Sequence, residues 1–154
     1  MRKEQYPGEM KEALLKGLQH DPGNAQGAYG AAIMPELISC DPVRLEVLYR
    51  YSCDALLSNA AGSIHGGAVA TWMDICQGNL IAWLNGGYPD PTISLQLSYM
   101  RPVVPGRPAF IRSKIDHFSG HLCFASSQLW QKEGEMAASA SGVFRIGVPL
   151  SINI

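Results

Sequence analysis

The sequence predicts an α+β domain in which a curled antiparallel sheet surrounds one long helix. Residues 65–84 show no strand pattern, could make five helical turns, and carry apolar side chains on all sides, so this helix is enclosed. Most of the chain after Thr92 consists of long segments of strand character separated by turn residues. The chain has 154 residues, of which 47% are hydrophobic, enough for one domain with its own core.

The N-terminal part predicts one short helix and one strand. Met10, Leu14 and Leu18 recur every four residues, which predicts a helix over residues 8–19 that ends at the turn residues 20–23. We therefore expect a helical extension at residues 1–30 and a main domain at residues 31–154, together forming one unit. Residues 43–52 alternate and predict a half-buried strand, whose inward side chains are Val43, Leu45, Val47, Tyr49 and Tyr51.

The C-terminal part predicts an antiparallel meander. Strands are expected at residues 92–100, 109–117, 121–131 and 136–146, with a loop at 102–108 and turns at 119–120 and 132–135. The last strand is rich in Ala, Ser and Gly, which allows another backbone to approach closely. Before this meander, Asn85-Gly86-Gly87 is expected to end the long helix.

Composition narrows the class of protein. The net charge is -1, from 12 Lys+Arg and 13 Asp+Glu, so no basic footprint for nucleic acid or an anionic membrane is present. Charged residues make up only 16%, which suggests that a second subunit covers part of the apolar surface. The charged N-terminus does not resemble a signal peptide, and polar residues interrupt the apolar stretch 68–84, so we expect a cytoplasmic protein without a membrane span.

The four cysteines do not form a metal motif. Cys40, Cys53, Cys76 and Cys123 are far apart, and no CxxC or CxxH spacing occurs. We expect reduced, buried thiols that pack as small hydrophobes, with a disulfide or a reactive thiol as the alternative.

Asp74 is the first candidate for chemistry. It is the only carboxylate between Ile64 and Leu84, where no Lys or Arg occurs. A carboxylate on an enclosed helix costs several kcal/mol unless it is hydrogen-bonded or reaches a cleft. Asp74 is therefore either a satisfied structural group or a functional one.

The second candidate is Ser63-Ile64-His65-Gly66-Gly67, at the start of the same helix. The first N–H groups of a helix lack partners and lie at the positive end of its dipole. Glycines there let a ligand approach the backbone, so an oxyanion could be bound. A glycine turn that merely begins the helix is the alternative.

The spacing of these two candidates favours a dimer. Gly66 and Asp74 are eight residues apart, about 12 Å along a helix. A carbonyl held at Gly66 is thus poorly placed for attack directed by Asp74 of the same helix. Two antiparallel copies of the helix would bring each Gly66 near the other chain's Asp74, which favours a two-fold dimer with sites across the interface.

The residues in question resemble a known family. In chain order the pattern consists of Asn59, His65-Gly66-Gly67, Asp74, and Thr92, which opens a strand that runs into Tyr99-Met100-Arg101-Pro102. The pattern is similar to the motif of the hotdog-fold acyl-CoA thioesterases of the phenylacetate-degradation (PaaI) type. The resemblance covers roughly residues 40–147. It implies a long central helix wrapped by five or six antiparallel strands, homodimers that often pair into tetramers, and hydrolysis of acyl-CoA with neither metal nor cofactor, CoA being part of the substrate.

The resemblance also implies roles for individual residues. Asp74 would be the general base or the nucleophile, and Gly66 would offer its N–H to the thioester oxygen. Asn59 would help to hold that carbonyl or the attacking water, Thr92 would orient the water or Asp74, and His65 would line the site. Gly67 is a further candidate for substrate binding, and the candidates for binding the CoA phosphates are Arg101, Arg107, His121 and Arg145.

Each assignment has a structural alternative. Asn59 could simply close the loop, Thr92 could only begin a strand, and His65 could be a satisfied imidazole. Basic residues at loops and strand ends are usually just solvated. His121 stands where relatives often carry Lys or Arg, so contacts with the CoA phosphates are not fixed by the motif.

Three other functions compete with the thioesterase. A hotdog dehydratase or hydratase uses a His with an acidic partner, and only His65 lies near the helix. A non-catalytic acyl-CoA-binding module and a purely structural interaction protein are the others; the last leaves Asp74 unexplained. Acyl specificity is not encoded in a motif. Four aromatic or sulfur-containing side chains could line an acyl pocket, although such side chains more often belong to the core: Trp72, Trp83, Tyr88 and Met100.

Overall fold

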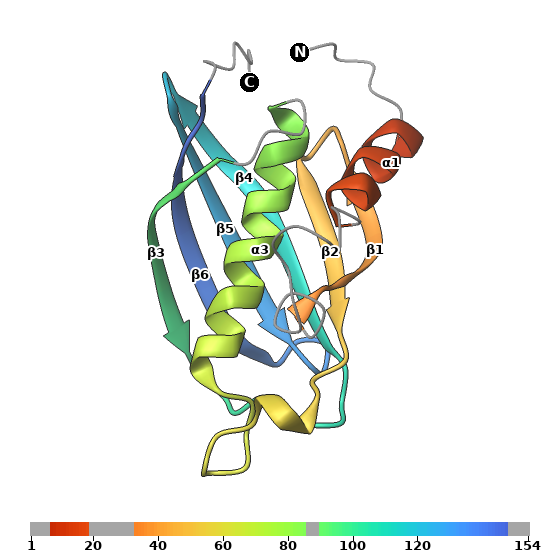
Figure 1. Cartoon of the computed structure of the whole chain (residues 1–154), viewed down its shortest axis with the longest axis vertical. Helices are drawn as coiled ribbons and strands as arrows, with labels where there is room; N and C mark the ends of the chain where they lie inside the picture. Colours follow the sequence, from red (N-terminus) through yellow and green to blue (C-terminus); the bar gives the residue numbers. More distant parts are fainter. Residues whose placement is uncertain (1–6, 19–32, 86–89, 148–154) are drawn as a thin grey trace.

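The computed structural model describes residues 7–18, 33–85 and 90–147. It contains a six-stranded antiparallel sheet in the order β1-β2-β4-β5-β6-β3, with the long helix α3 packed across one face (Figure 1). The helices are α1 (Pro7–Leu18) and α3 (Gly66–Leu84), and a short 3-10 turn η1 (Ala55–Leu57) precedes α3. The strands are β1 (Glu36–Asp41), β2 (Glu46–Tyr51), β3 (Thr92–Tyr99), β4 (Ala109–Ser119), β5 (Leu122–Trp130) and β6 (Met136–Arg145). The predicted fold, one long helix wrapped by a curved antiparallel sheet, is confirmed.

The order of the strands corrects the predicted meander at one point. β4, β5 and β6 are consecutive neighbours, but β3 pairs with β6 at the edge of the sheet and not with β4, which pairs with β2. The connection between β3 and β4 is too long for a tight hairpin, so it can cross the end of the sheet. As a result β3 forms an edge that lies next to α3 (Figure 1).

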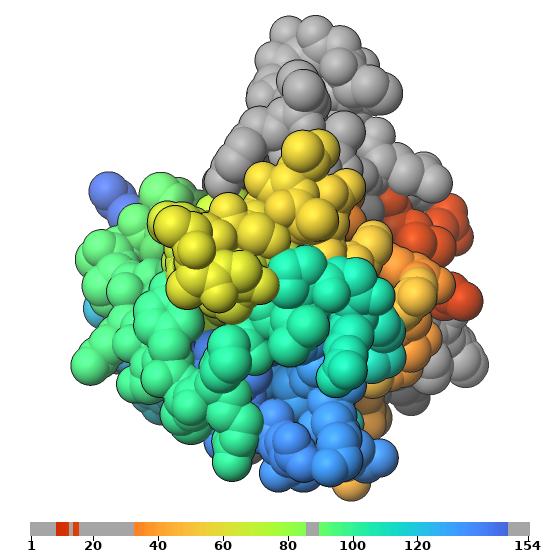
Figure 2. All heavy atoms as spheres, turned by 90° about the horizontal axis from the view of Figure 1, so that it is seen from below, coloured from red at the N-terminus to blue at the C-terminus, as the bar shows by residue number. Residues whose placement is uncertain are grey.

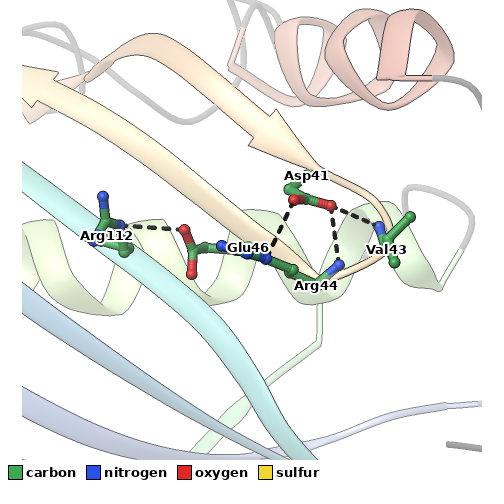
Figure 3. Close-up of polar contacts among 5 residues, drawn as sticks. All are labelled: Asp41, Val43, Arg44, Glu46 and Arg112. Atoms are coloured by element: carbon green, nitrogen blue, oxygen red, sulfur yellow. Dashed lines mark hydrogen bonds and ion pairs between the residues drawn. The ribbon is translucent and has the colours of Figure 1, made fainter.

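The strand predicted at residues 43–52 begins later, because a turn occupies its first residues. The carboxylate of Asp41 accepts the N–H groups of Val43 (2.9 Å) and Arg44 (3.0 Å), and Leu45 has a positive φ of 53° (Figure 3). Val43 is consequently 88% exposed, not inward-facing. The turn joins β2 to β1, a strand that the alternation did not reveal; Val47, Tyr49 and Tyr51 are buried as predicted.

The core lies between α3 and the sheet. Buried side chains occupy most of the length of the helix: Val69, Trp72, Met73, Cys76, Gln77, Leu80, Ile81, Trp83 and Leu84. Met10 and Leu14 of α1 join the same core, and the described cysteines are free, three of them buried. The other predicted elements end within two residues of their observed bounds, while the turn at 20–23 and Gly86, Gly87 and Tyr88 fall outside the described residues.

A buried polar contact fixes α3 against the sheet. The amide of Gln77, which is fully buried, donates to the hydroxyl of Ser127 (2.9 Å), and that hydroxyl lies 2.7 Å from the hydroxyl of Ser113. Gly142 of β6 leaves the space for this amide, since a Cβ at that position would lie 2.1 Å from Oε1 of Gln77. Polar groups buried in this way favour one register of helix on sheet. The register decides where Asp74, one turn earlier on α3, is held.

Candidate active site

The loop before α3 is tied to its surroundings by its own side chains. Asn59 closes it: its Oδ1 accepts the N–H groups of Ala61 (2.9 Å) and Ser63 (3.3 Å), and its Nδ2 donates to the hydroxyl of Ser63 (3.0 Å). The N–H of Ile64 donates to the carbonyl of Val103 (2.8 Å), which joins the loop to the segment after β3. The loop-closing role expected as the alternative for Asn59 is therefore present in the single chain.

His65 caps α3 and leaves one backbone donor open. Its Nδ1 accepts the N–H of Gly67 (2.9 Å), and its carbonyl accepts the N–H groups of Ala68 (2.9 Å) and Val69 (3.2 Å). Because Nδ1 is an acceptor, the proton of the neutral ring lies on Nε2. Within the described residues the N–H of Gly66 has no partner, although it lies at the positive end of a 19-residue helix.

The open N–H belongs to a residue that lines a cavity of about 360 Å³. Its walls come from the loop before α3, the first turn of α3 and the segment after β3: Asn59, Ser63, Ile64, Gly66, Val69, Tyr99, Met100, Arg101, Pro102 and Val103. Figure 2 shows this end of the molecule, where the loop before α3 (yellow) meets the end of β3 and the following segment (green). His65 and Gly67 do not line the cavity.

The carboxylate of Asp74 is hydrogen-bonded to the side chain of Thr92. The Thr92 hydroxyl donates to Oδ1 of Asp74 at 2.8 Å, joining α3 to the first residue of β3. The Asp74 side chain is half-buried on the face of α3 away from the core. Its second oxygen, Oδ2, makes none of the hydrogen bonds found among the described residues, so this carboxylate keeps acceptor capacity.

The structure thus brings the predicted residues together in two groups and not in one. Asn59 and Gly66 line the cavity, whereas Asp74 and Thr92 do not. Eight residues of helix separate Gly66 from Asp74, about 12 Å of axial rise. One chain therefore presents a donor site and a carboxylate site on one helix, too far apart to act on one carbonyl.

The predicted cations lie at both ends of the sheet. Arg101 lines the cavity, and its guanidinium donates to the carbonyl of Met136 (2.6 Å). His121 and Arg145 lie at the other end: Nδ1 of His121 is 3.1 Å from the carbonyl of Ile146, and the N–H of Arg145 donates to the carbonyl of Pro91, beside Thr92. They therefore lie at the same end of the sheet as Thr92 and do not line the cavity. Arg107 is exposed in the loop before β4.

A second cavity, of about 460 Å³, is lined by the end of β2, the segment that follows it and Trp72 of α3. Tyr51 and Trp72 line it with their rings stacked at 4.6 Å, together with Cys53. Burial raises the pKa of the Cys53 thiol to about 11, so at neutral pH this group is a thiol and not a nucleophilic thiolate. Of the specificity candidates, Trp72 and Trp83 are core residues, and Met100 lines the first cavity.

Sequence reasoning named Ser63 in the candidate turn and Tyr99 in the motif, but it gave neither residue a place in a cavity. Both belong to segments that the motif contains, but their place beside Gly66 depends on the contact between the loop and the end of β3. No group of three or more potential metal ligands occurs in the described part of the chain, nor does any helix there have the length and apolarity to cross a membrane.

The fold, the cavity at Gly66 and the Asp74–Thr92 pair define a class of protein, the hotdog-type domains. In this class a long helix that begins at an HGG turn is wrapped by an antiparallel sheet. Solved structures of this class superpose on most of the chain. The Escherichia coli PaaI protein of the phenylacetic acid degradation operon gives a TM-score of 0.77 at 16% identity, covering 96% of this chain and 100% of that one. Zebrafish thioesterase superfamily member 2 gives 0.73 at 21% identity (93% and 99% covered), and a phenylacetic acid degradation-related protein of Ralstonia eutropha gives 0.72 at 20% (87% and 99%).

The sequence profile of the thioesterase superfamily matches residues 61–138, about half of the chain. The protein belongs to the thioesterase superfamily. No curated protein matches its sequence. The matched span contains Gly66, Asp74 and Thr92, and begins two residues after Asn59.

Proposed function

We propose that the protein hydrolyses an acyl-CoA thioester to the free acid and CoA, in a site completed by two subunits. Water adds to the thioester carbonyl, the C–S bond breaks, and the CoA thiolate leaves and takes up a proton. Membership of the thioesterase superfamily supports the reaction class. A Streptococcus mutans protein of similar fold was solved with acetyl-CoA bound, which supports CoA as the carrier. The observation that carries the proposal is the open N–H of Gly66, a residue that lines a cavity at the positive end of α3.

The open N–H would stabilise the charge that develops on the thioester oxygen. Hydrogen-bond donors held in place before the reaction need no reorganisation in the transition state, and losing one typically costs about 10²- to 10³-fold in rate. Gly66 suits this role because it is the first residue of α3 and lines the cavity. The α3 dipole adds a favourable field for the oxyanion.

Asp74 would direct the attack, either by taking a proton from water or by attacking the carbonyl itself. The hydrogen bond from Thr92 orients the carboxylate and leaves Oδ2 free to reach the water or the carbonyl. His65 is a less suitable base, because its Nδ1 holds the N–H of Gly67 as the cap of α3. That commitment argues against the dehydratase alternative, which needs a His with an acidic partner as its catalytic pair.

A second copy of the chain would bring Asp74 to Gly66. β3 is an edge strand, and most of its residues are exposed; Ile93 is 56% exposed. An unprotected apolar edge is a pairing surface. Two-fold pairing of β3 strands would lay two α3 helices side by side in opposite directions, so that each cavity receives the partner's Asp74 and Thr92. Pairs of such dimers remain a further expectation.

The same arrangement would distribute the cations around CoA. Arg101 lies at the cavity itself, whereas the partner's copies of His121 and Arg145 would approach with the partner's Asp74. Charge-assisted contacts with phosphate would hold the nucleotide while the acyl group enters the cavity. Neither metal nor cofactor has a role in this mechanism.

A panel of short, medium and aryl acyl-CoA thioesters, with free thiol as the readout, tests the proposal on wild type and Asp74→Asn. We expect CoA release from at least one thioester, and a loss of at least about 100-fold in the variant. Thr92→Val is the matched variant: it keeps the shape of Thr92 but removes the donor to Asp74, and should lose less. Binding of CoA without turnover would point to a binding module, and hydration of an enoyl-CoA without thiol release would point to a dehydratase.

A further inference from the structure

We infer that Tyr99 is a positioning residue that holds the Gly66–Gly67 peptide, and through it the open N–H of Gly66, in the orientation that receives the thioester oxygen. The hydroxyl of Tyr99 donates to the carbonyl of Gly66 at 2.8 Å. Tyr99 is the last residue of β3, so this bond joins the edge strand to the first residue of α3. The kinetic consequence rests on the proposed thioesterase function; the structural consequence does not.

Tyr99 completes a set of bonds on both peptides that flank Gly66. The Gly66–Gly67 peptide is held at its two ends, its carbonyl by the Tyr99 hydroxyl and its N–H by Nδ1 of His65. In the preceding peptide, the carbonyl of His65 accepts from Ala68 and Val69. The N–H of Gly66 is therefore the one polar backbone group of these two peptides that has no partner among the described residues.

The sequence makes such a clamp necessary. Two consecutive glycines have the greatest backbone freedom of any residue pair, so the N–H of Gly66, the first of them, would be poorly fixed without outside contacts. A catalytic donor gains its effect from being held in place beforehand. The Tyr99 ring also lies close by: a Cβ on Gly66 would be 3.4 Å from the ring, which limits movement of this turn toward β3.

Tyr99 can be changed without endangering the fold. Its side chain is 55% exposed, so Tyr99→Phe removes a hydroxyl at the surface and keeps the ring. Tyr51→Phe is the matched control, because its hydroxyl also contacts an α3 carbonyl, that of Trp72 at 3.4 Å, but Tyr51 does not line the cavity that Gly66 lines. Both variants lose a tyrosine hydroxyl near a carbonyl of the same helix.

The first test needs no substrate. Amide hydrogen exchange and NMR shifts of Gly66 and Gly67 are measured in wild type, Tyr99→Phe and Tyr51→Phe. We expect the Gly67 amide to exchange about 3- to 10-fold faster in Tyr99→Phe, the range set by the loss of one hydrogen bond, and to be unchanged in Tyr51→Phe. Equal exchange rates and shifts in wild type and Tyr99→Phe would overturn the inference, whatever the protein catalyses.

The second test separates positioning from substrate binding. On the best thioester of the panel, Tyr99→Phe should lower kcat about 3- to 10-fold and leave KM within about twofold, because the donor acts in the transition state. A higher KM with unchanged kcat would mean that Tyr99 is only a wall of the cavity and would overturn the inference. Absence of turnover in wild type would instead refute the proposed function, and the exchange measurement would still decide the role of Tyr99.

Discussion

Replacing Gly66 by proline removes the proposed oxyanion donor and little else. Gly66 is the first residue of α3, the position that proline favours because its missing N–H has no partner within the helix. The preceding residue, His65, already has φ −59° and ψ 135°, the extended conformation required before proline. The backbone can therefore keep its course while the open N–H of Gly66 is lost.

The expected effect is large on rate and small on stability. Loss of one oxyanion donor typically costs about 10²- to 10³-fold in kcat, about 2.7–4 kcal/mol of transition-state stabilisation. Gly66→Ala is the control: it keeps the N–H, and its Cβ would lie 3.4 Å from the Tyr99 ring, an ordinary contact. We expect kcat of Gly66→Ala within about fivefold of wild type and unfolding free energies of both variants within about 1 kcal/mol of wild type.

Steady-state kinetics with urea unfolding measures both quantities, and calorimetry with free CoA checks that the nucleotide still binds. The reasoning is refuted if folded Gly66→Pro keeps kcat within about fivefold of wild type. It is also refuted if Gly66→Ala is as inactive as Gly66→Pro, because the side chain and not the N–H would then decide the rate.

Three further predictions follow from the packing and the exposed edge. Gly142→Ala would place its Cβ 2.1 Å from Oε1 of the buried Gln77, so urea unfolding should show that the unfolding free energy falls by about 2–4 kcal/mol. In the control Gly147→Ala the new Cβ has no neighbour within 4 Å, so the unfolding free energy should change by less than about 0.5 kcal/mol. Burial raises the pKa of Cys53 to about 11, so the folded state favours the protonated thiol. The unfolding free energy should therefore be insensitive to this group below about pH 8 and should fall as the pH rises from there toward 11. An unfolding free energy that stays constant over that range would contradict the assignment. Ile93→Lys puts a charge on the β3 edge; light scattering should show monomers, and activity should fall in parallel, while a monomer with full activity would rule out the shared site.

Periodicity predicted the long helix and most strands, because each is defined by its own side chains. The enclosed helix was readable from apolar residues on all its sides, and the start at His65 from the glycines that follow it. The position of β3 was not readable, because pairing with β6 depends on contacts between distant segments. The start of β2 was misjudged because the Asp41 side chain organises a turn that a simple alternation of Val43 and Leu45 conceals.

The candidate site also has features that the sequence predicted and features that it could not predict. Spacing along α3 already separated Gly66 from Asp74. The resemblance to the family left Thr92 with either the water or Asp74 as its partner, and the structure has a hydrogen bond of 2.8 Å between Thr92 and Asp74. Tyr99 could not be placed from sequence, since nothing local to residues 92–100 says that the last side chain of the strand reaches the first residue of the helix. Likewise, the cap formed by His65 depends on the rotamer of one ring, which composition and spacing do not determine.

The central claim is that a complete site takes Gly66 from one subunit and Asp74 from the other, and mixing two inactive variants tests it most directly. A dimer of one Gly66→Pro chain and one Asp74→Asn chain would have two shared sites. One of these sites would contain both substitutions, and the other would contain neither. Coexpressed and randomly paired, the two variants should recover about a quarter of wild-type activity, although each alone is nearly inactive. Activity no higher than that of the separate variants, in a mixture shown by mass spectrometry to contain the mixed dimer, would contradict the shared site.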